Sequence, residues 1–121
     1  MNSVIKNNNL EITKGSLTTI DTTYLNSVER HFYNKYGHIV VLELTLTLQT
    51  AFTDDVSNGY KLFSGAPASA NNATRFILHN TFSGSSLPIR LEVTTSGIIQ
   101  TCYTPFAQVG QYTAVIAYIT S

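Results

Sequence analysis

The segment "GHIVVLELTLTLQT", from Gly37 to Thr50, constrains the fold more than any other part of the chain. Successive side chains of a β-strand point to opposite faces, and here the residues alternate between an apolar and a threonine-rich register. The sequence therefore predicts one long strand that places a leucine face in a hydrophobic core. The apolar register comprises Val40, Leu42, Leu44, Leu46 and Leu48, and the other comprises Val41, Glu43, Thr45, Thr47 and Gln49.

Strand-like segments alternate with turn signals along most of the chain, and no segment shows helical periodicity. "VERHFY" (28–33) precedes the long strand, and "NKYG" (34–37) between them predicts a tight hairpin turn. The fold class that this pattern predicts is all-β, an antiparallel β-sandwich of jelly-roll type. The further predicted strands are "YKLF" (60–63), "TRFILHNT" (74–81), "LPIRLEVTT" (87–95), "IIQTCY" (98–103) and "QYTAVIAYIT" (111–120).

The strand pattern becomes regular at Val28, which suggests a boundary within the chain. Residues 1–27 are rich in Asn and Thr, with possible short strands at "LEI" and "SLTTI". We expect them to form an N-terminal arm or a linker. Residues 28–121 are expected to form one β-sandwich head domain, since 121 residues suffice for a single hydrophobic core.

The final predicted strand is apolar on both registers, so both of its faces must be covered. The core of a two-layer sandwich covers only one face of a strand, and an oligomer interface would cover the other. The alternative is that a loop from residues 51–73 folds over the strand. We predict an oligomer interface formed by Ala114, Ile116 and Tyr118.

Composition excludes several classes of partner. Charged residues make up 12% of the chain, and seven basic residues balance seven acidic ones, so we expect no nucleic-acid partner. The first fifteen residues are polar, so we expect neither a signal peptide nor membrane insertion. The single cysteine, Cys102, excludes an intrachain disulfide and is expected to be a small buried residue.

The sequence shows no pattern typical of a catalytic or metal site. His31, His38 and His79 lack neighbouring ligands at the spacing that Zn²⁺ requires. Asp54 and Asp55 are adjacent, so their side chains would point apart in an extended chain, whereas glycosidase carboxylates face each other. We expect no catalytic residues, no enzymatic activity, no metal and no cofactor.

A series of segments resembles the C-terminal head domains of phage tail-fibre, baseplate and receptor-binding proteins. It runs from "NKYGHIVVLELTLTL" through "SGAPAS", "TRFILHN" and "IRLEVTTSGIIQT" to "AVIAYIT", over roughly residues 28–121. In the loop, this chain has a single proline, Pro67, where family members often have two. The similarity is carried by K-x-G-x-x-V (Lys35, Gly37, Val40) and T-x-x-G-x-I (Thr94, Gly97, Ile99).

This resemblance implies a structural and adhesive module of a phage or phage-like tail. Such heads are homotrimers that bind host-surface saccharide or protein, and their other partners are tail or baseplate proteins. The protein would then be located in the virion and made in the host cytoplasm without a signal peptide. Two alternatives are a stand-alone carbohydrate-binding module and a trimeric jelly roll similar to tumour necrosis factor or complement heads.

We expect the ligand to bind at the loop formed by residues 51–73, because binding residues on rigid scaffolds concentrate in loops. Carboxylate and amide groups together with an aromatic ring suit sugars, and an arginine at the exit of the loop could reach a neighbouring subunit. The alternative is that the loop only closes the sandwich. The predicted ligand-binding residues are Asp54, Asp55, Asn58, Tyr60 and Arg75.

Overall fold

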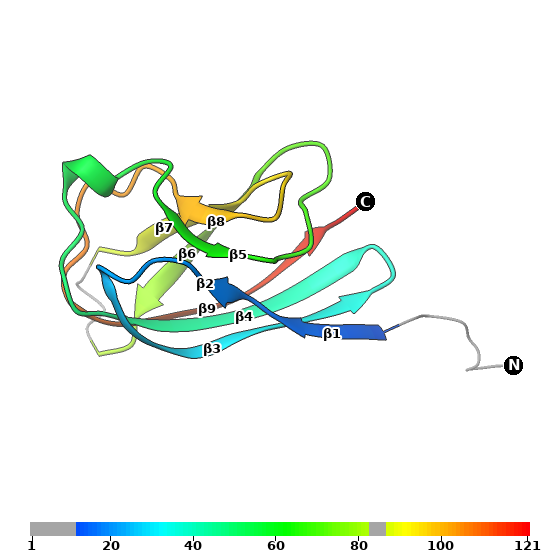
Figure 1. Ribbon diagram of the computed structural model, residues 1–121, viewed down its shortest axis with the longest axis horizontal. Coiled ribbons are helices and arrows are strands. Elements are labelled where there is room, and N and C mark those ends of the chain that lie inside the picture. Colours follow the sequence, from blue (N-terminus) through cyan, green and yellow to red (C-terminus); the bar gives the residue numbers. More distant parts are fainter. Residues whose placement is uncertain (1–11, 83–86) are drawn as a thin grey trace, which may run out of the picture.

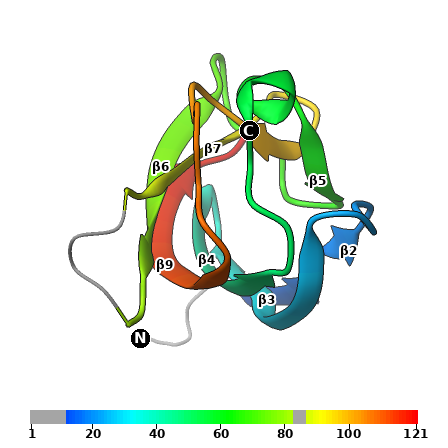
Figure 2. The same ribbon diagram turned by 90° about the vertical axis from the view of Figure 1, so that its left-hand side faces the viewer.

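The computed structural model describes residues 12–82 and 87–121, which form an all-β domain. Within these residues, nine antiparallel strands make one nearly closed, barrel-like sheet (Figures 1 and 2). The predicted all-β antiparallel fold is confirmed. The strands are β1 (Ile12–Ser16), β2 (Thr18–Thr19), β3 (Leu25–Tyr36), β4 (Ile39–Leu48), β5 (Lys61–Ser64), β6 (Thr74–Asn80), β7 (Ile89–Val93), β8 (Ile99–Thr101) and β9 (Gly110–Ile119), and a 3₁₀ turn, η1 (Asp54–Val56), precedes β5.

The structure has one nearly closed sheet in place of the predicted two-layer sandwich, because the strands on opposite sides of the core are joined along both sides. The strand order is β1-β3-β4-β9-β6-β7-β8-β5-β2. On one side, β6 pairs with β7 and then with β9, so the ladder continues from one layer to the other. On the other side, Leu17 N donates to His31 O at 2.8 Å, and Ile20 N donates to Leu62 O at 2.9 Å. The chain between β1 and β2 thus crosses between layers and nearly closes the barrel.

The long predicted strand is β4, and its leucine register lies in the core as expected. The residues from Val40 to Leu48 on that register are all buried. The hairpin turn lies further along than the sequence suggested, because β3 extends to Tyr36 and pairs there with Ile39. Gly37 occupies the turn with a φ of 61°, which a residue with a side chain rarely adopts.

The polar ends of buried tyrosines have hydrogen-bond partners at the edge of the core. The Tyr112 hydroxyl donates to Gln108 O at 2.8 Å, and the Tyr118 hydroxyl donates to Pro67 O at 2.8 Å. Tyr33 packs its ring over Gly15, where an added Cβ would lie 2.3 Å from the ring. The missing side chain of Gly15 therefore makes room for the ring.

Part of the predicted N-terminal arm belongs to the barrel. β1 pairs with β3, β2 pairs with β5, and β3 begins at Leu25, three residues before the boundary that the sequence suggested. Short polar strands at the edge of a sheet have weak alternation, so the sequence pattern underestimates them. Residues 1–11, which include most of "LEI", lie outside the described part of the chain.

The structure places Ala114, Ile116 and Tyr118 on the inward face of β9, not on its exposed face. Their partners on β4 are Leu44, Leu42 and Val40, and cross-strand partners share a face. The outward residues of β9 include Val115, which is 67% exposed, and Ile119, which is 56% exposed. The predicted interface residues therefore pack against the core of their own chain. A strand that is apolar on both registers does not indicate which one faces inward.

The loop from residues 51–73 contacts the end of β9 but leaves this outward face uncovered. Ala70 N donates to Ile119 O at 2.9 Å, and the Thr120 hydroxyl donates to Ala68 O at 2.5 Å. These contacts are made at the edge of the strand. The loop therefore lies against the end of β9, and the outer side of β9 stays exposed.

We predict that Leu78→Ala lowers the free energy of unfolding by about 2–5 kcal/mol, because it leaves a cavity in the core. Leu78 is fully buried, whereas its neighbour His79 points outward and is exposed. The matched variant His79→Ala should change stability by less than about 0.5 kcal/mol. Urea unfolding measures both values. Equal losses for the two variants would contradict the assigned register of β6.

Candidate binding groove

The outer surface of β6 and β7 forms a groove with the segment that follows β8. One cavity of about 430 Å³ lies between Arg90 and Phe106, and another of about 330 Å³ lies between Arg75 and Tyr103. Both are lined by Arg90 and Tyr103, so they adjoin. We call this surface the arginine–tyrosine groove; its principal residues are Arg75, Ile77, Arg90, Tyr103, Pro105 and Phe106.

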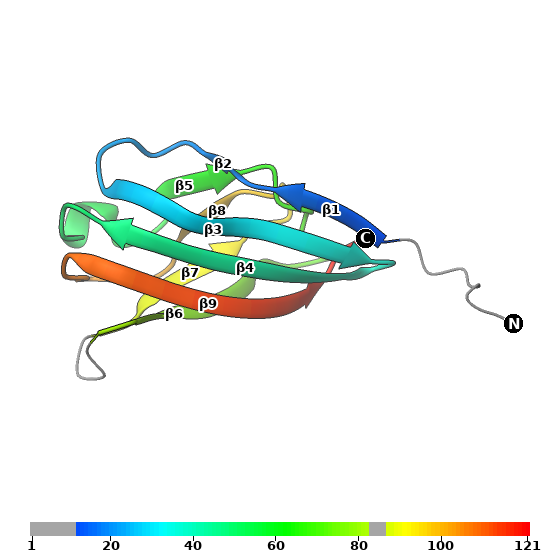
Figure 3. The same cartoon turned by 90° about the horizontal axis from the view of Figure 1, so that it is seen from below.

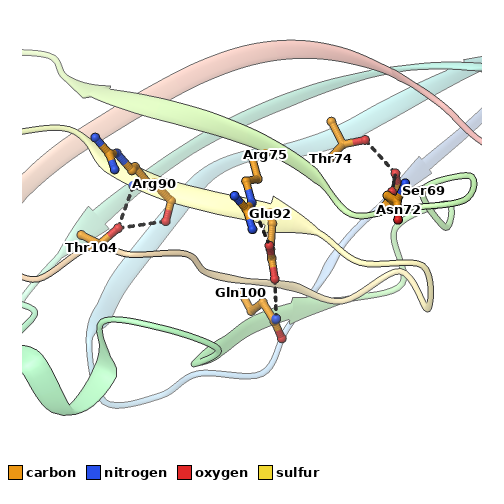
Figure 4. Close-up of polar contacts among 8 residues, drawn as sticks. All are labelled: Ser69, Asn72, Thr74, Arg75, Arg90, Glu92, Gln100 and Thr104. Carbon is orange, nitrogen blue, oxygen red and sulfur yellow. Dashed lines mark hydrogen bonds and ion pairs between the residues drawn. The ribbon is translucent and has the colours of Figure 1, made fainter.

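A buried threonine fixes the wall of the groove. The Thr104 hydroxyl accepts a hydrogen bond from Arg90 N at 2.8 Å and donates one to Arg90 O at 2.9 Å (Figure 4). Thr104 N also donates to Ser57 O at 2.8 Å, and Cys102 N donates to Arg90 O at 3.0 Å. These bonds continue the β7 ladder beyond β8, and they hold residues 102–104 against β7 and the end of the η1 segment.

Tyr103 lies between these anchor points in an unfavourable backbone conformation. Its φ is 50°, a left-handed value that costs a residue with a side chain on the order of 1 kcal/mol. The ring is 59% exposed, so core packing does not hold it there. The hydrogen bonds of Thr104 and Cys102 hold the backbone on both sides of Tyr103 and so restrict its backbone conformation. Such strain is concentrated at functional sites in proteins, which makes Tyr103 the first candidate for ligand contact.

Arg75 lies beside the tyrosine ring and at the end of a polar row across three strands. Its Cζ is 5.7 Å from the centroid of the Tyr103 ring, within the range of a cation–π contact. Its Nε is 3.6 Å from Oε1 of Glu92, and Gln100 Nε2 donates to Oε2 of Glu92 at 2.7 Å (Figure 4). The Arg75 side chain is 67% exposed and that of Glu92 only 15%. The positive charge of Arg75 is therefore more accessible to a ligand than the negative charge of Glu92.

Arg90 supplies a second positive charge to the groove. Its backbone is held by Thr104, and it lies opposite Ile77 in the β6–β7 ladder. The ion pairs found within residues 12–82 and 87–121 are Arg30–Glu43 and Arg75–Glu92, so the guanidinium of Arg90 takes part in neither. Its charge is therefore available to a ligand.

Cys102 lies beneath the groove as a buried thiol, as the sequence suggested. Burial and the nearby Glu92 carboxylate raise the pKa of this thiol. The thiol therefore stays protonated at neutral pH and is a poor nucleophile.

The structure separates the predicted ligand-binding residues. Asp54 and Asp55 are exposed in η1, and Asn58 is exposed in the turn that follows. Tyr60 is engaged elsewhere, because its hydroxyl donates to Asp21 and its ring packs edge-on at 5.3 Å from Tyr24. Arg75 alone of the predicted set lines the arginine–tyrosine groove.

Asp21 is a buried residue that the sequence analysis did not identify. Its carboxyl group holds the backbone of the residues that lead into β3. It accepts hydrogen bonds from Tyr24 N and Leu25 N at 2.9 Å each, and from Thr23 N at 3.3 Å. Together with the Tyr60 hydroxyl, these donors compensate the burial of the charge. A lone Asp in a threonine-rich stretch has no sequence pattern that predicts this role.

The histidines do not converge on a common point. The Nδ1 atom of His31 is 3.0 Å from Leu17 O, and its ring stacks on Phe32. His38 lies in the hairpin turn, and His79 lies on the outer face of β6. Among residues 12–82 and 87–121, no group of three or more His, Cys, Asp or Glu side chains is placed to hold a metal ion.

Sequence reasoning missed Arg90, Tyr103 and Phe106. A signal was present in "CYTPF", because aromatic residues beside a proline in a turn have no evident role in a core. The outward direction of Arg90 followed from the alternation of β7. Their convergence with Arg75 depends on pairing between β6, β7 and the chain after β8.

No protein-family model matches the chain, and no curated protein matches it significantly. The described part of the chain has no helix long and apolar enough to cross a membrane. The groove offers a ligand two guanidinium groups and exposed aromatic rings.

We predict that Thr104→Val lowers the free energy of unfolding by about 1–3 kcal/mol, because Arg90 N then lacks its hydrogen-bond partner in a partly buried position. The matched variant Thr104→Ser keeps the hydroxyl and should retain most of the stability. Urea unfolding of both variants tests the role of the hydroxyl. A loss as large for serine as for valine would show that the methyl group, and not the hydrogen bonds, holds the segment.

The hydrogen bond from Tyr60 to Asp21 predicts a specific dependence on pH. Burial, followed by the hydrogen bond to Asp21, raises the pKa of Tyr60 from 10.0 to about 12. The stabilisation from the protonated hydroxyl is therefore complete below pH 10 and is lost as the pH rises through 12. We expect the difference in unfolding free energy between wild type and Tyr60→Phe to shrink over this range. Other tyrosines contribute equally to both proteins, so a difference independent of pH would contradict the coupling.

Proposed function

We propose that the chain is a structural and adhesive module of a phage or phage-like tail, in a fibre or baseplate, which binds host-surface saccharide as a homotrimer. One observation carries this proposal. The small domain has an exposed apolar face on one part of its barrel and a separate groove with exposed aromatic rings on another. The apolar face suits association with other copies of the chain, and the groove suits binding of a saccharide.

The apolar face lies on the outer side of the β1-β3-β4-β9 part of the sheet (Figure 3), at the end where β4 begins and β9 ends, and it adjoins the exposed Arg30–Glu43 ion pair. Strand pairing aligns Ile12, Tyr36, Ile39 and Ile119 in one row across four strands. β9 itself has no charged residue from Gly110 to Ile119. We call this surface the assembly face; it comprises Ile12, Tyr36, Ile39, Val41, Val115, Ala117 and Ile119.

Covering this face would favour association of several copies. Large exposed apolar patches are rare on soluble monomers, and such patches mark interaction sites. A closed ring brings the same surface of each subunit to a common axis, so one patch per chain is sufficient. The resemblance to trimeric phage heads favours three copies. The assembly face thus replaces the inward residues Ala114, Ile116 and Tyr118 as the proposed interface.

The position of the groove suits adhesion. η1 and the segment after β8 lie at one end of the barrel, whereas β1 begins and β9 ends at the other (Figure 1). A tail structure joined on the N-terminal side of β1 would lie at the end of the barrel opposite the Phe106 end of the groove. Tyr103 and Phe106 are exposed there, and aromatic rings are suited to stacking on sugars. The protein would then be part of the virion and would have other tail or baseplate proteins as partners.

A second candidate is a stand-alone carbohydrate-binding module, which the groove alone would favour. That function requires no assembly face and no partner chain. The oligomeric state therefore distinguishes the two candidates.

We predict that the protein forms a homotrimer of three 13.3 kDa chains, about 40 kDa, in light scattering after gel filtration. Val115→Asp should yield a folded monomer, because it places a charge on the assembly face without disturbing the core. The matched variant Val115→Thr keeps the branched shape and should stay trimeric. Ile116→Asp faces inward and should unfold the chain instead. A wild-type protein that elutes as a monomer would contradict the trimer and favour the second candidate.

Adhesion is tested by sedimentation of the whole chain with insoluble cell walls from a panel of bacteria. We expect saturable binding to at least one preparation and its loss after removal of the wall polysaccharide. Failure to bind any preparation in the panel would contradict the adhesive function.

A further inference from the structure

The arginine–tyrosine groove has an excess of positive charge. It contains two guanidinium groups, from Arg75 and Arg90, and one neighbouring carboxylate, from Glu92. Glu92 is already bound by Gln100, and its side chain is much less exposed than that of Arg75. Asp54 and Asp55, which lie in η1 at this end of the barrel, do not line the groove. One positive charge remains uncompensated within this set of residues.

Rigid apolar surface lies beside these charges. The Tyr103 ring is held by its anchored backbone and by the guanidinium of Arg75, and Pro105 and Phe106 continue the surface. An exposed ring of this kind offers a flat face to the C–H groups of a sugar. The anchored backbone of Tyr103 and the Arg75 guanidinium beside its ring restrict the ring before a ligand arrives, which reduces the entropic cost of binding.

The dimensions match a short saccharide. The cavities of about 430 and 330 Å³ are each within the range of small-molecule sites and share Arg90 and Tyr103. A ligand across both would contact Arg75, Arg90 and the tyrosine ring. Arginine binds carboxylate and phosphate oxygens through paired N–H groups, which makes it selective for such anions.

We infer that the groove binds an acidic saccharide, a sugar or polyol unit that carries a carboxylate or a phosphate. This inference rests on the proposed saccharide-binding function and specifies its ligand class. Arg90 and Arg75 hold the anionic group, and Tyr103 stacks on the adjacent ring or carbon chain. Bacterial surface polymers supply such units either as uronic acids or as polyol phosphates, which share this chemistry.

The experiment is calorimetric titration of the whole chain with three probes. These are a glucuronate-containing tetrasaccharide, an oligo(glycerol phosphate) and neutral maltotetraose. We expect at least one acidic probe to bind about tenfold or more tighter than maltotetraose. Raising NaCl from about 50 to about 500 mM should weaken the acidic probe alone, because salt screens exposed charges. The tighter of the two acidic probes assigns the source as uronic acid or polyol phosphate.

Variants locate the site. Arg75→Gln and Arg90→Gln should each weaken the acidic probe about tenfold or more. The matched control is Arg30→Gln, which removes an exposed arginine from β3, far from the groove in the strand order. The control should bind as wild type does. Tyr103→Phe keeps the ring and should retain affinity, whereas Tyr103→Ala should not. Thermal unfolding of each variant confirms that the fold is intact.

Two results would overturn the inference. One is equal affinity for maltotetraose and both acidic probes, and the other is an equal effect of Arg90→Gln and Arg30→Gln. If the chain binds cell walls but neither acidic probe, the inference fails while the adhesive function stands. If it binds an acidic probe but no cell wall, the adhesive function fails while the ligand class of the groove stands.

Discussion

The pairing of β4 with β9 is the interaction on which the rest of the structure depends. Ten residues of each strand pair continuously, from Ile39 with Ile119 to Leu48 with Gly110. Because the leucines of β4 are directed into the core, their partners on β9 must be directed there too. One ladder therefore assigns Tyr118 to the core and Val115 to the exterior. The exposed apolar face that we propose for assembly results from this register as directly as the core does.

A smaller constraint of the same kind shapes the groove. The Thr104 hydroxyl both accepts from and donates to the backbone of Arg90, so a turn outside any regular strand is held in register with β7. The consequence is local strain at Tyr103 and an aromatic ring that faces solvent. The burial and hydrogen bonds of Thr104 compensate this strain, so the chain can hold Tyr103 in a left-handed conformation at the surface.

Most strands were predictable from the sequence because each has its own local pattern. Alternation over Val40 to Leu48 and over Ile89 to Val93 identified the inward faces of β4 and β7, and both are buried as expected. The glycine at position 37 indicated a hairpin turn within one or two residues. The edge strands β1 and β2 were assigned to an arm instead, because short polar strands differ little from linkers in composition. The continuity of the sheet through β6 depends on its two partners, β7 and β9, and has no local pattern.

The sequence by itself determined the all-β fold, the leucine face of the core and the absence of recognisable catalytic motifs. Tertiary structure alone decided two other matters. It determined which of the two apolar registers of β9 faces the core. The two registers differ by a one-residue slip and are almost equal in composition, so the sequence does not distinguish them. It also brought Arg75, Arg90 and Tyr103 to one groove, while Tyr60 became a partner of Asp21. The physical reason is the same in both cases. Local patterns specify which side chains of a strand share a face, but only pairing between distant segments specifies what that face meets.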